Sequence, residues 1–373
     1  MEISLCMIVK NEEELLERCL ECVSSFIDEI ILVDTGSTDK TKEIAKDFGA
    51  LIYDFEWCND FAKARNYAFS KATKDYIMWL DADDYITKDN IEKIVLLKST
   101  LTPNIDSVSM HYSLRRDEYG NTVTSLRRNR IVKREKNFKW IGRIHEYLDI
   151  SGNILPADIY IYHDKHKTHT DRNLKIYRQM QKENVLFSPR DIYYFANELY
   201  YNHLYEEATS QYINFLNTDG WVEDKKNAVA NLMQCFEATN QPEMKINALL
   251  ESLKWTKPRA DICCKLADYF FEKKAYTDAI FWYKVALMCT PEKGSMALDF
   301  KDYYTWIPTI QLCVCFSLLG DYYMAYYYNE LCAKLGCEPS KITHNRNFLT
   351  AQLEQKGEPI PQFDIDLVDK RYK

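Results

Sequence analysis

The order of apolar segments in the first hundred residues constrains the fold more than any other feature of the sequence. Short apolar runs alternate there with stretches of helical period, in the order ISLCMIV (3–9), EEELLERCLECVSSF (12–26), EIILVD (29–34), DKTKEIAKDFG (39–49), ALIYDF (50–55), DFAKARNYAFSKA (60–72) and DYIMWLD (75–81). Strands separated by helices of about 10–15 residues predict right-handed crossovers and a parallel sheet that is covered on both faces. Between about residues 105 and 165, strand-like segments follow one another and predict a mixed extension of the same sheet; they are SVSMHYSL, TVTSL, NRIVKR, FKWIG and ADIYIYH.

From about residue 172 onward the sequence predicts helices only. Three of the helical segments share the pattern Tyr-x-x-Ala: YEEATSQYINFL (205–216), YTDAIFWYKVAL (276–287) and YYMAYYYNELCA (322–333). Residues three or four apart lie on one helix face, so a small Ala beside an aromatic ring suits a tight contact between helices. These segments resemble tetratricopeptide helix pairs, which repeat at about 34 residues. We therefore predict an α/β domain at 1–170, an all-α tetratricopeptide-like domain at 171–355 and a C-terminal tail at 356–373.

Composition limits the environment and the partners. The net charge of −8 gives no general electrostatic support for a nucleic-acid partner. No apolar run reaches the roughly 18 residues of a membrane-spanning helix, so no span is predicted. The start MEISLCMIVKNEE has no basic leader and is expected to be a first strand, and the chain has twelve Cys. We therefore expect a cytoplasmic protein whose cysteines are free thiols.

Three carboxylates follow the strand expected near residues 76–80. Asp81, Asp83 and Asp84 stand within four positions, where like charges repel and burial is costly. A solvated acidic turn is one explanation. The other is a metal site, because ligands of parallel sheets bind outside the carboxyl ends of the strands. Mg²⁺ or Mn²⁺ takes oxygen ligands, can bridge to a diphosphate and relieves the repulsion.

Five motifs support the second explanation when they are taken as a set. VKNEE closes the first strand, VDTGSTD the second and LDADD the fourth, WCNDFAKARN opens a helix, and GRIHEYL comes later. This set resembles the family-2 glycosyltransferases with the GT-A fold, over roughly residues 1–165. The whole chain is similar to family-2 enzymes fused to tetratricopeptide repeats, and among them to the peptide S-glycosyltransferases that modify bacteriocin cysteines. The resemblance implies a nucleotide-sugar-binding GT-A domain with a mixed, mainly parallel sheet, followed by the helical repeat domain.

The resemblance also implies roles for residues of the nucleotide site. Asp34 would accept a hydrogen bond from the uracil imide, with Glu12 near the ribose. Arg65 would brace the base or Asp34, and Asp81, with the adjacent Ala82, would lie at the ribose or at a metal-bound water. The structural alternatives are that Asp34 caps the following helix and that Arg65 is a surface residue.

The metal and diphosphate site would involve three further residues. Asp83 would ligate the metal directly, and His163 in IYIYHDK would complete its shell, since imidazole is an acceptable Mn²⁺ ligand. Asp84 would be no more than a polar neighbour. A lone His in a strand is otherwise a structural residue. Arg130 aligns with an arginine that faces the diphosphate, although the neighbours Arg127 and Arg128 leave its register open.

Family-2 enzymes generally invert the sugar anomeric centre, and a hydroxyl acceptor then needs a carboxylate base. Glu146 in GRIHEYL is the first candidate for the base and His145 is the second. A Cys acceptor would need less help, because a thiol loses its proton more readily. Alternatively, His145 and Glu146 only organise an acceptor loop.

Three functions remain open at this point. The first is a metal-dependent enzyme that moves a hexose from a UDP-sugar to a peptide or protein side chain, with Cys among the acceptors. The second is the same enzyme acting on a cell-envelope glycan. The third is a non-enzymatic repeat scaffold with a silent nucleotide domain. The helical repeats could hold an acceptor peptide, or form a homodimer through aromatic faces such as YYMAYYY (322–328).

Overall fold

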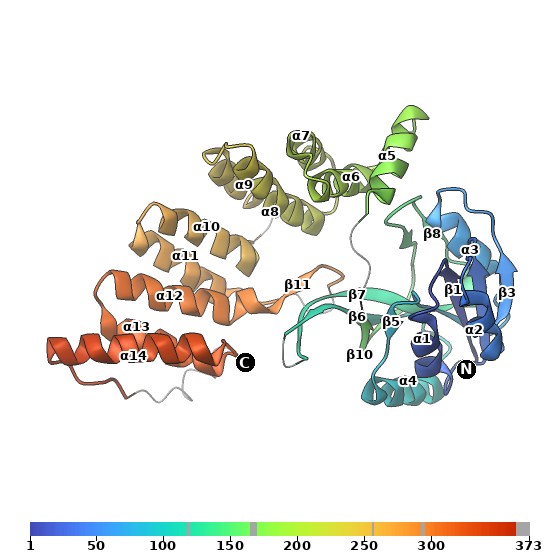
Figure 1. Cartoon of the computed structure of the whole chain (residues 1–373), viewed down its shortest axis with the longest axis horizontal. Helices are drawn as coiled ribbons and strands as arrows, with labels where there is room; N and C mark the ends of the chain where they lie inside the picture. The colour runs from blue at the N-terminus through green and yellow to red at the C-terminus, as the bar shows by residue number, and fades with distance from the viewer. Residues whose placement is uncertain (118–119, 165–169, 256, 292–294, 363–373) are drawn as a thin grey trace. The chain divides into compact units, whose positions relative to one another are not determined.

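The computed structural model describes residues 1–117, 120–164, 170–255, 257–291 and 295–362. The chain divides into two compact units, the first covering Met1–Leu204 and a short segment that ends at Leu298, and the second beginning at Tyr205 (Figure 1). The boundary predicted at 170/171 rested on the change from strands to helices in the sequence. In the structure the first unit extends to Leu204, so that it also includes the two helices between residues 171 and 204. Of the tail predicted at 356–373, residues 363–373 lie outside the described residues.

The first unit is built on one mixed sheet. Four of its strands are mutually parallel, with β2 and β4 on either side of β1 and with β3 beside β2. β7 pairs antiparallel with β4 and with β6, β10 runs parallel to β6, and β5 runs antiparallel to β10. These strands are β1 (Ile3–Val9), β2 (Glu29–Asp34), β3 (Leu51–Asp54), β4 (Tyr76–Trp79), β5 (Asp84–Tyr85), β6 (Ser107–Arg116), β7 (Thr122–Lys133) and β10 (Ile154–His163), and β8 (Trp140–Ile141) pairs separately with β9 (Tyr147–Leu148). The predicted mixed, mainly parallel GT-A-like architecture is confirmed.

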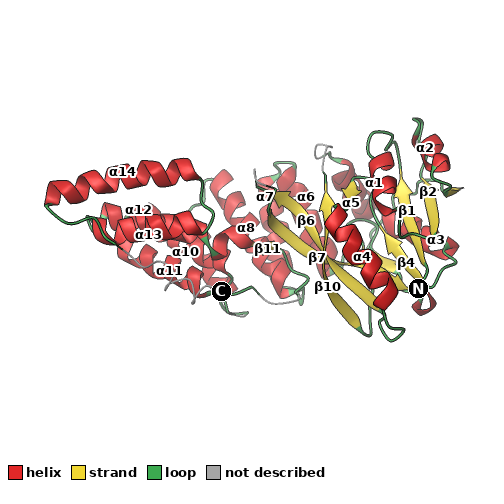
Figure 2. Ribbon diagram, turned by 90° about the horizontal axis from the view of Figure 1, so that it is seen from below, coloured by secondary structure: helices red, strands yellow, loops and turns green. Residues whose placement is uncertain are grey.

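Helices cover both faces of this sheet, as the apolar strands predicted. Alternate residues of β1 point to opposite sides, so that Leu5 joins a core with Leu16 and Leu20 of α1, whereas Cys6 joins one with Ala68 of α3. Figure 2 shows α1 and α4 in front of the strands. The helices of this unit are α1 (Leu16–Val23), α2 (Thr41–Asp47), α3 (Phe61–Lys71), α4 (Lys88–Thr100), α5 (Arg172–Lys182) and α6 (Pro189–Tyr201).

Local sequence signals set the ends of the two helices that matter most for the site. At α3, the Asp60 side chain accepts a hydrogen bond from the Lys63 backbone N–H at 2.9 Å, which satisfies a free donor of the first turn. At α6, Ser188 and Asp191 form a reciprocal capping box, and Pro189 occupies the first turn.

The second unit contains helices that pack in succession, each against the next. They are α7 (Tyr205–Leu216), α8 (Val222–Ala238), α9 (Met244–Ser252), α10 (Ala260–Glu272), α11 (Tyr276–Met288), α12 (Trp306–Leu318), α13 (Tyr322–Lys334) and α14 (Pro339–Lys356), with a short β11 (Asp299–Phe300). Ala279 and Tyr283 of α11 share a core with Ala325 and Tyr328 of α13, so the Ala of these two Tyr-x-x-Ala patterns is buried between helices. The Tyr of each pattern, Tyr276 and Tyr322, is only half-buried. The predicted all-α region is confirmed.

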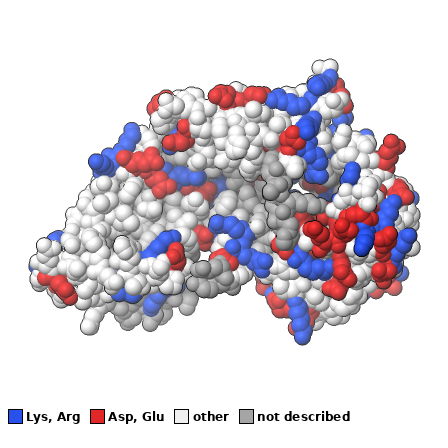
Figure 3. Space-filling view, in the orientation of Figure 1, with Lys and Arg blue, Asp and Glu red and all other residues white. Residues whose placement is uncertain are grey.

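Two surface properties bear on partners. Acidic and basic side chains are interspersed on the face that Figure 3 shows. Among the helices of the described residues, none combines the length and the apolar character that crossing a bilayer requires.

Candidate active site

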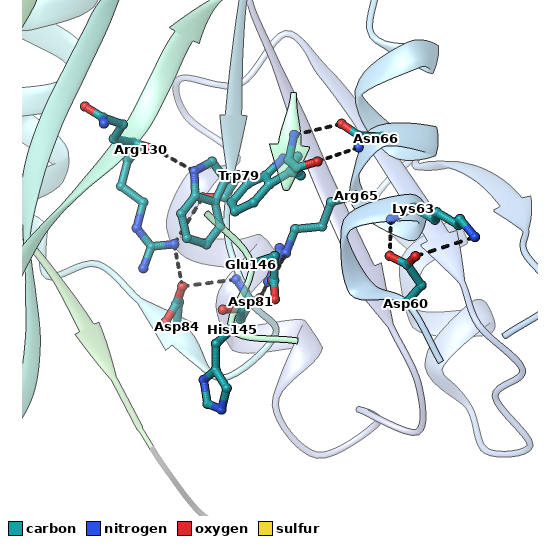
Figure 4. A network of polar contacts seen from close by, with 12 residues as sticks. Asp60, Lys63, Arg65, Asn66, Trp79, Asp81, Asp84, Arg130, His145 and Glu146 are labelled. Atoms are coloured by element: carbon teal, nitrogen blue, oxygen red, sulfur yellow. Dashed lines mark hydrogen bonds and ion pairs between the residues drawn. The ribbon is translucent and has the colours of Figure 1, made fainter. Parts of the chain in front are cut away.

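Arg65 of α3 connects three of the sequence motifs. Its Nη2 donates to Asp81 Oδ1 at 2.8 Å and its Nε donates to Glu146 Oε1 at 2.6 Å (Figure 4). Arg65 is only 7% exposed, and its guanidinium lies about equally far from the rings of Trp79 and Trp140, at 5.0 and 4.8 Å. Segments 16 and 81 positions apart in sequence therefore meet at one buried cation.

The two carboxylates keep Arg65 charged in this setting. Burial alone would lower the pKa of Arg65, but the charges of Asp81 and Glu146 raise it above its ordinary value. Burial alone would raise the pKa of Asp81, and the charges of Arg65 and Arg130 lower it instead. Arg65 is not a surface residue, and both of the carboxylates that it contacts were predicted site residues.

Asp84 is the most buried carboxylate of the acidic cluster. Its Oδ2 lies 3.0 Å from Arg130 Nη1 and accepts the Asp81 backbone N–H at 3.0 Å. The exposed fractions of the Arg130 and Asp84 side chains are 1% and 0%. Arg130 also donates to the Trp79 carbonyl at 3.3 Å. Asp84 thus organises the turn between β4 and β5, and the described contacts of Arg130 face inward.

Asp83, Asp84 and His163 form the one group of potential metal ligands that the described residues contain. One ligand atom from each lies within 4.8 Å of the others. β5 and β10 bring them together, because Asp84 pairs with His163 in the antiparallel ladder. His163 Nδ1 lies 3.5 Å from Asp83 Oδ1, 3.7 Å from Asp84 Oδ1 and 2.9 Å from the Tyr112 hydroxyl.

The donor set of this cluster suits a divalent cation. Two carboxylates and one imidazole match the preferences of Mn²⁺, and carboxylate oxygens match those of Mg²⁺. Asp84 Oδ1 is buried and has no hydrogen-bond partner among the described residues. Burial alone would lower the pKa of His163, but the nearby carboxylates of Asp83 and Asp84 raise it to about 10. The cluster thus attracts positive charge.

Asp34 ends β2 at the same edge of the sheet. Its Oδ1 accepts the backbone N–H groups of Gly36 and Ser37, each at 3.0 Å, and lies 3.5 Å from Lys42 Nζ. Burial alone would raise the pKa of Asp34, and the hydrogen bonds from Ser37 lower it. Its Oδ2 is buried and has no hydrogen-bond partner among the described residues. Asp34 therefore does not cap α2, whose N-cap residue is Lys40 and which has no side-chain cap hydrogen bond. One oxygen of Asp34 holds the turn after β2, and the other remains as an acceptor.

The remaining predicted residues lie at the same edge or close to it. Glu12 follows β1, and its backbone N–H donates to Thr41 Oγ1 at 2.8 Å. Ala82 is buried between Asp81 and Asp83. β1 separates Asp34 from Asp81, so two strand spacings of ~4.8 Å put them about 10 Å apart along the sheet edge.

Glu146 and His145 point to different partners. The Glu146 carboxylate faces Arg65, whereas His145 turns away from Arg65 in Figure 4. His145 Nε2 lies 2.9 Å from Glu198 Oε1 of α6. Sequence reasoning missed Glu198, Trp79 and Trp140 as neighbours of the site. The spacing of polar and aromatic residues on α6 was the available signal, but that segment was assigned to the repeats.

Comparisons with known proteins agree with this architecture. The sequence model of Glycosyl transferase family 2 matches residues 4–155. A TPR repeat-containing protein of Synechococcus elongatus is 37% identical over 151 residues, which are 40% of this chain and 36% of that protein. The SPbeta prophage-derived glycosyltransferase SunS of Bacillus subtilis is 29% identical over 289 residues, which are 72% of this chain and 65% of SunS.

The match to SunS covers more of the chain than the first unit occupies, so it continues into the helices. This chain spans about a third of the Synechococcus protein and less than two thirds of SunS. A solved structure of S. aureus TarS 1–349 in complex with UDP-GlcNAc aligns over 97% of this chain and 93% of that one, with 13% identity and a TM-score of 0.35. From the family match and the sheet topology, we conclude that the first unit contains a family-2 glycosyltransferase domain of the GT-A type, followed by a helical region.

Proposed function

We propose that the protein is an inverting, metal-dependent glycosyltransferase that moves a hexose from a UDP-sugar to a side chain of a peptide or protein, with Cys as an accepted nucleophile. The observation that carries this proposal is the pairing of two features on one sheet edge. A buried, unpartnered carboxylate oxygen of Asp34 stands at one point, and the cluster of Asp83, Asp84 and His163 stands at another.

The first feature suits a uracil base. The imide N–H of uracil is a donor, and Asp34 Oδ2 is an acceptor that is otherwise costly to bury. Lys42 and the backbone N–H groups already hold the other oxygen of Asp34 in place. Glu12 remains our proposed contact to the ribose.

The second feature suits the diphosphate. Asp83, Asp84 and His163 would hold Mn²⁺ or Mg²⁺, and such an ion would stabilise negative charge on the departing UDP. Asp81 and Ala82 would then line the ribose side of the same turn. We retain Arg130 as a site residue, although its described contacts indicate that it acts by holding Asp84.

Glu146 is our proposed base for a hydroxyl acceptor, and His145 is the second choice. The ion pair with Arg65 orients the Glu146 carboxylate, which is 11% exposed. Such a carboxylate accepts the proton of an attacking hydroxyl. A thiolate acceptor would attack without that step.

The acceptor class rests on the similarity of NDFAKARN and of the domain order to peptide S-glycosyltransferases of bacteriocin cysteines. We propose that the helical unit holds the peptide, since helical repeats bind extended segments. A homodimer through this unit and a cytoplasmic location are parts of the same proposal. An envelope glycan as acceptor, or a scaffold without activity, would be the alternative outcomes.

Release of UDP from a panel of UDP-sugars, with and without Mn²⁺ or Mg²⁺, tests the proposal. We expect metal-dependent release that accelerates when a Cys-containing peptide is added, and a mass increase of one hexose on the peptide. Acceleration by a glycan alone would identify the second acceptor class. If no UDP-sugar releases UDP, the hypothesis of a repeat scaffold without activity would be favoured.

A further inference from the structure

Helix α6 presents one stripe of side chains to the loop that carries Glu146. Arg190, Tyr194 and Glu198 are spaced four residues apart, so they share a helix face. All three contact His145, the residue directly before Glu146. These contacts lie within the first unit, to which α6 belongs.

The His145 side chain is held from two sides. Its Nε2 lies 2.9 Å from Glu198 Oε1, and a carboxylate only accepts, so the imidazole N–H is the donor. Glu198 is 2% exposed and also accepts from Asn173 Nδ2 of α5 at 3.0 Å. The imidazole stacks on the Tyr194 ring, with centroids 4.1 Å apart and planes 12° from parallel.

The His145 backbone is held as well. Arg190 Nε and Nη2 each donate to the His145 carbonyl at 3.1 Å. His145 has a φ of +49°, in the left-handed region that residues other than Gly rarely adopt. A residue stays in such a conformation when its surroundings determine it. Both the direction and the backbone twist of His145 therefore depend on α6.

This twist decides where Glu146 points. His145 faces α6, and the next side chain turns to Arg65 of α3 at 2.6 Å. We infer that Arg190, Tyr194 and Glu198 are positioning residues that fix the loop 142–147 and aim the Glu146 carboxylate. The inference rests on the proposed role of Glu146 as the base. It makes α6 part of the transferase rather than the first element of a peptide-binding repeat.

Two variants separate positioning from general support of the fold. Arg190→Met keeps the aliphatic stem and removes both donors to the His145 carbonyl. Glu198→Gln keeps the size of the side chain and removes the charge that His145 faces. Arg190→Lys restores one donor and serves as the conservative rescue. Lys175→Met, at an exposed residue of α5 that pairs with Asp171, is the matched control for loss of a cation.

The full-length chain is used throughout. Amide hydrogen exchange of peptides that cover residues 142–148 reports the loop directly, without reference to activity. We expect faster exchange there in Arg190→Met and Glu198→Gln, native exchange in Lys175→Met, and partial recovery in Arg190→Lys. For transfer to a hydroxyl acceptor, we expect kcat to fall about 10- to 100-fold while the affinity for UDP stays within about twofold.

The outcomes distinguish this inference from the proposed function. Unchanged exchange in both variants would overturn the inference, whatever the activity. Faster exchange with unchanged kcat would also overturn it, because the loop would then not aim a base. Failure of the wild-type protein to bind any UDP-sugar would instead contradict the proposed function, and the exchange data would still decide whether α6 holds the loop.

Discussion

The buried ion pair between Arg130 and Asp84 gives the sharpest quantitative prediction. Their side chains are 1% and 0% exposed, and Nη1 and Oδ2 are 3.0 Å apart. Replacing Arg130 with Met keeps much of the packing volume but leaves the Asp84 charge buried without its cation. Breaking a buried pair from one side costs about 3–5 kcal/mol.

This cost can be converted into a melting temperature. The Tm of a folded unit of 150–250 residues falls by roughly 2–4 °C for each kcal/mol of stability that is lost, so Arg130→Met should lower Tm by roughly 6–20 °C. Differential scanning calorimetry of the full chain measures the change. Asp84→Asn added to Arg130→Met should recover part of the loss, because the uncompensated charge is then absent.

The neighbouring Arg127 provides a matched control. It is 7% exposed, and both of its terminal nitrogens donate to the Ala157 carbonyl, a neutral acceptor. Arg127→Met should cost only about 1–3 kcal/mol, the penalty of one unsatisfied buried group. A Tm loss for Arg130→Met that is no larger than the loss for Arg127→Met would refute the argument from buried charge.

Three further predictions concern the site itself. Asp34→Asn keeps an oxygen for the Gly36 and Ser37 N–H groups but replaces the unpartnered oxygen. Calorimetric titration should therefore show the affinity for uridine falling roughly 10- to 150-fold, at a nearly unchanged Tm. An equal affinity in the variant and the wild type would contradict the uracil assignment. Glu146→Gln should lower initial rates with a Ser peptide and spare those with a Cys peptide, and equal losses would argue against a base. The pKa of Asp81 is lower in the folded state than in the unfolded state, where it is about 4. The charge of Asp81 therefore stabilises the fold fully above about pH 4, and this contribution is lost as the pH falls through the pKa of the folded state. Tm measured from pH 5 to pH 3 should therefore fall more steeply for the wild type than for Arg65→Met, and parallel curves would contradict this.

The strands and helices of the sheet could be predicted because their signals are local. The expected segments 3–9 and 29–34 coincide with β1 and β2, since continuous apolar runs between polar turns leave little freedom. The segments TVTSL and NRIVKR were expected as separate pieces but form the single strand β7. Its polar residues interrupt the apolar pattern, and their burial depends on strands that the sequence does not place.

The site was predictable in its residue types but not in its pairings. The acidic cluster and Arg65 stood out by motif, whereas Asp84 looked like a polar neighbour and is the most buried of the three carboxylates. Its burial follows from Arg130, which lies 46 positions away. The direction of His145 depends likewise on Glu198, 53 positions away. Such pairings come from topology, which local patterns do not encode.

The central claim is that metal and UDP bind together at the edge of the sheet. The most direct test measures Tm of the wild type and of Asp83→Ala with UDP, Mn²⁺, or both. We predict that UDP and Mn²⁺ together raise the wild-type Tm more than the sum of their separate effects, and that Asp83→Ala abolishes this excess while a shift with UDP alone persists. An equal excess in Asp83→Ala, or no shift of the wild type with any combination, would contradict the account.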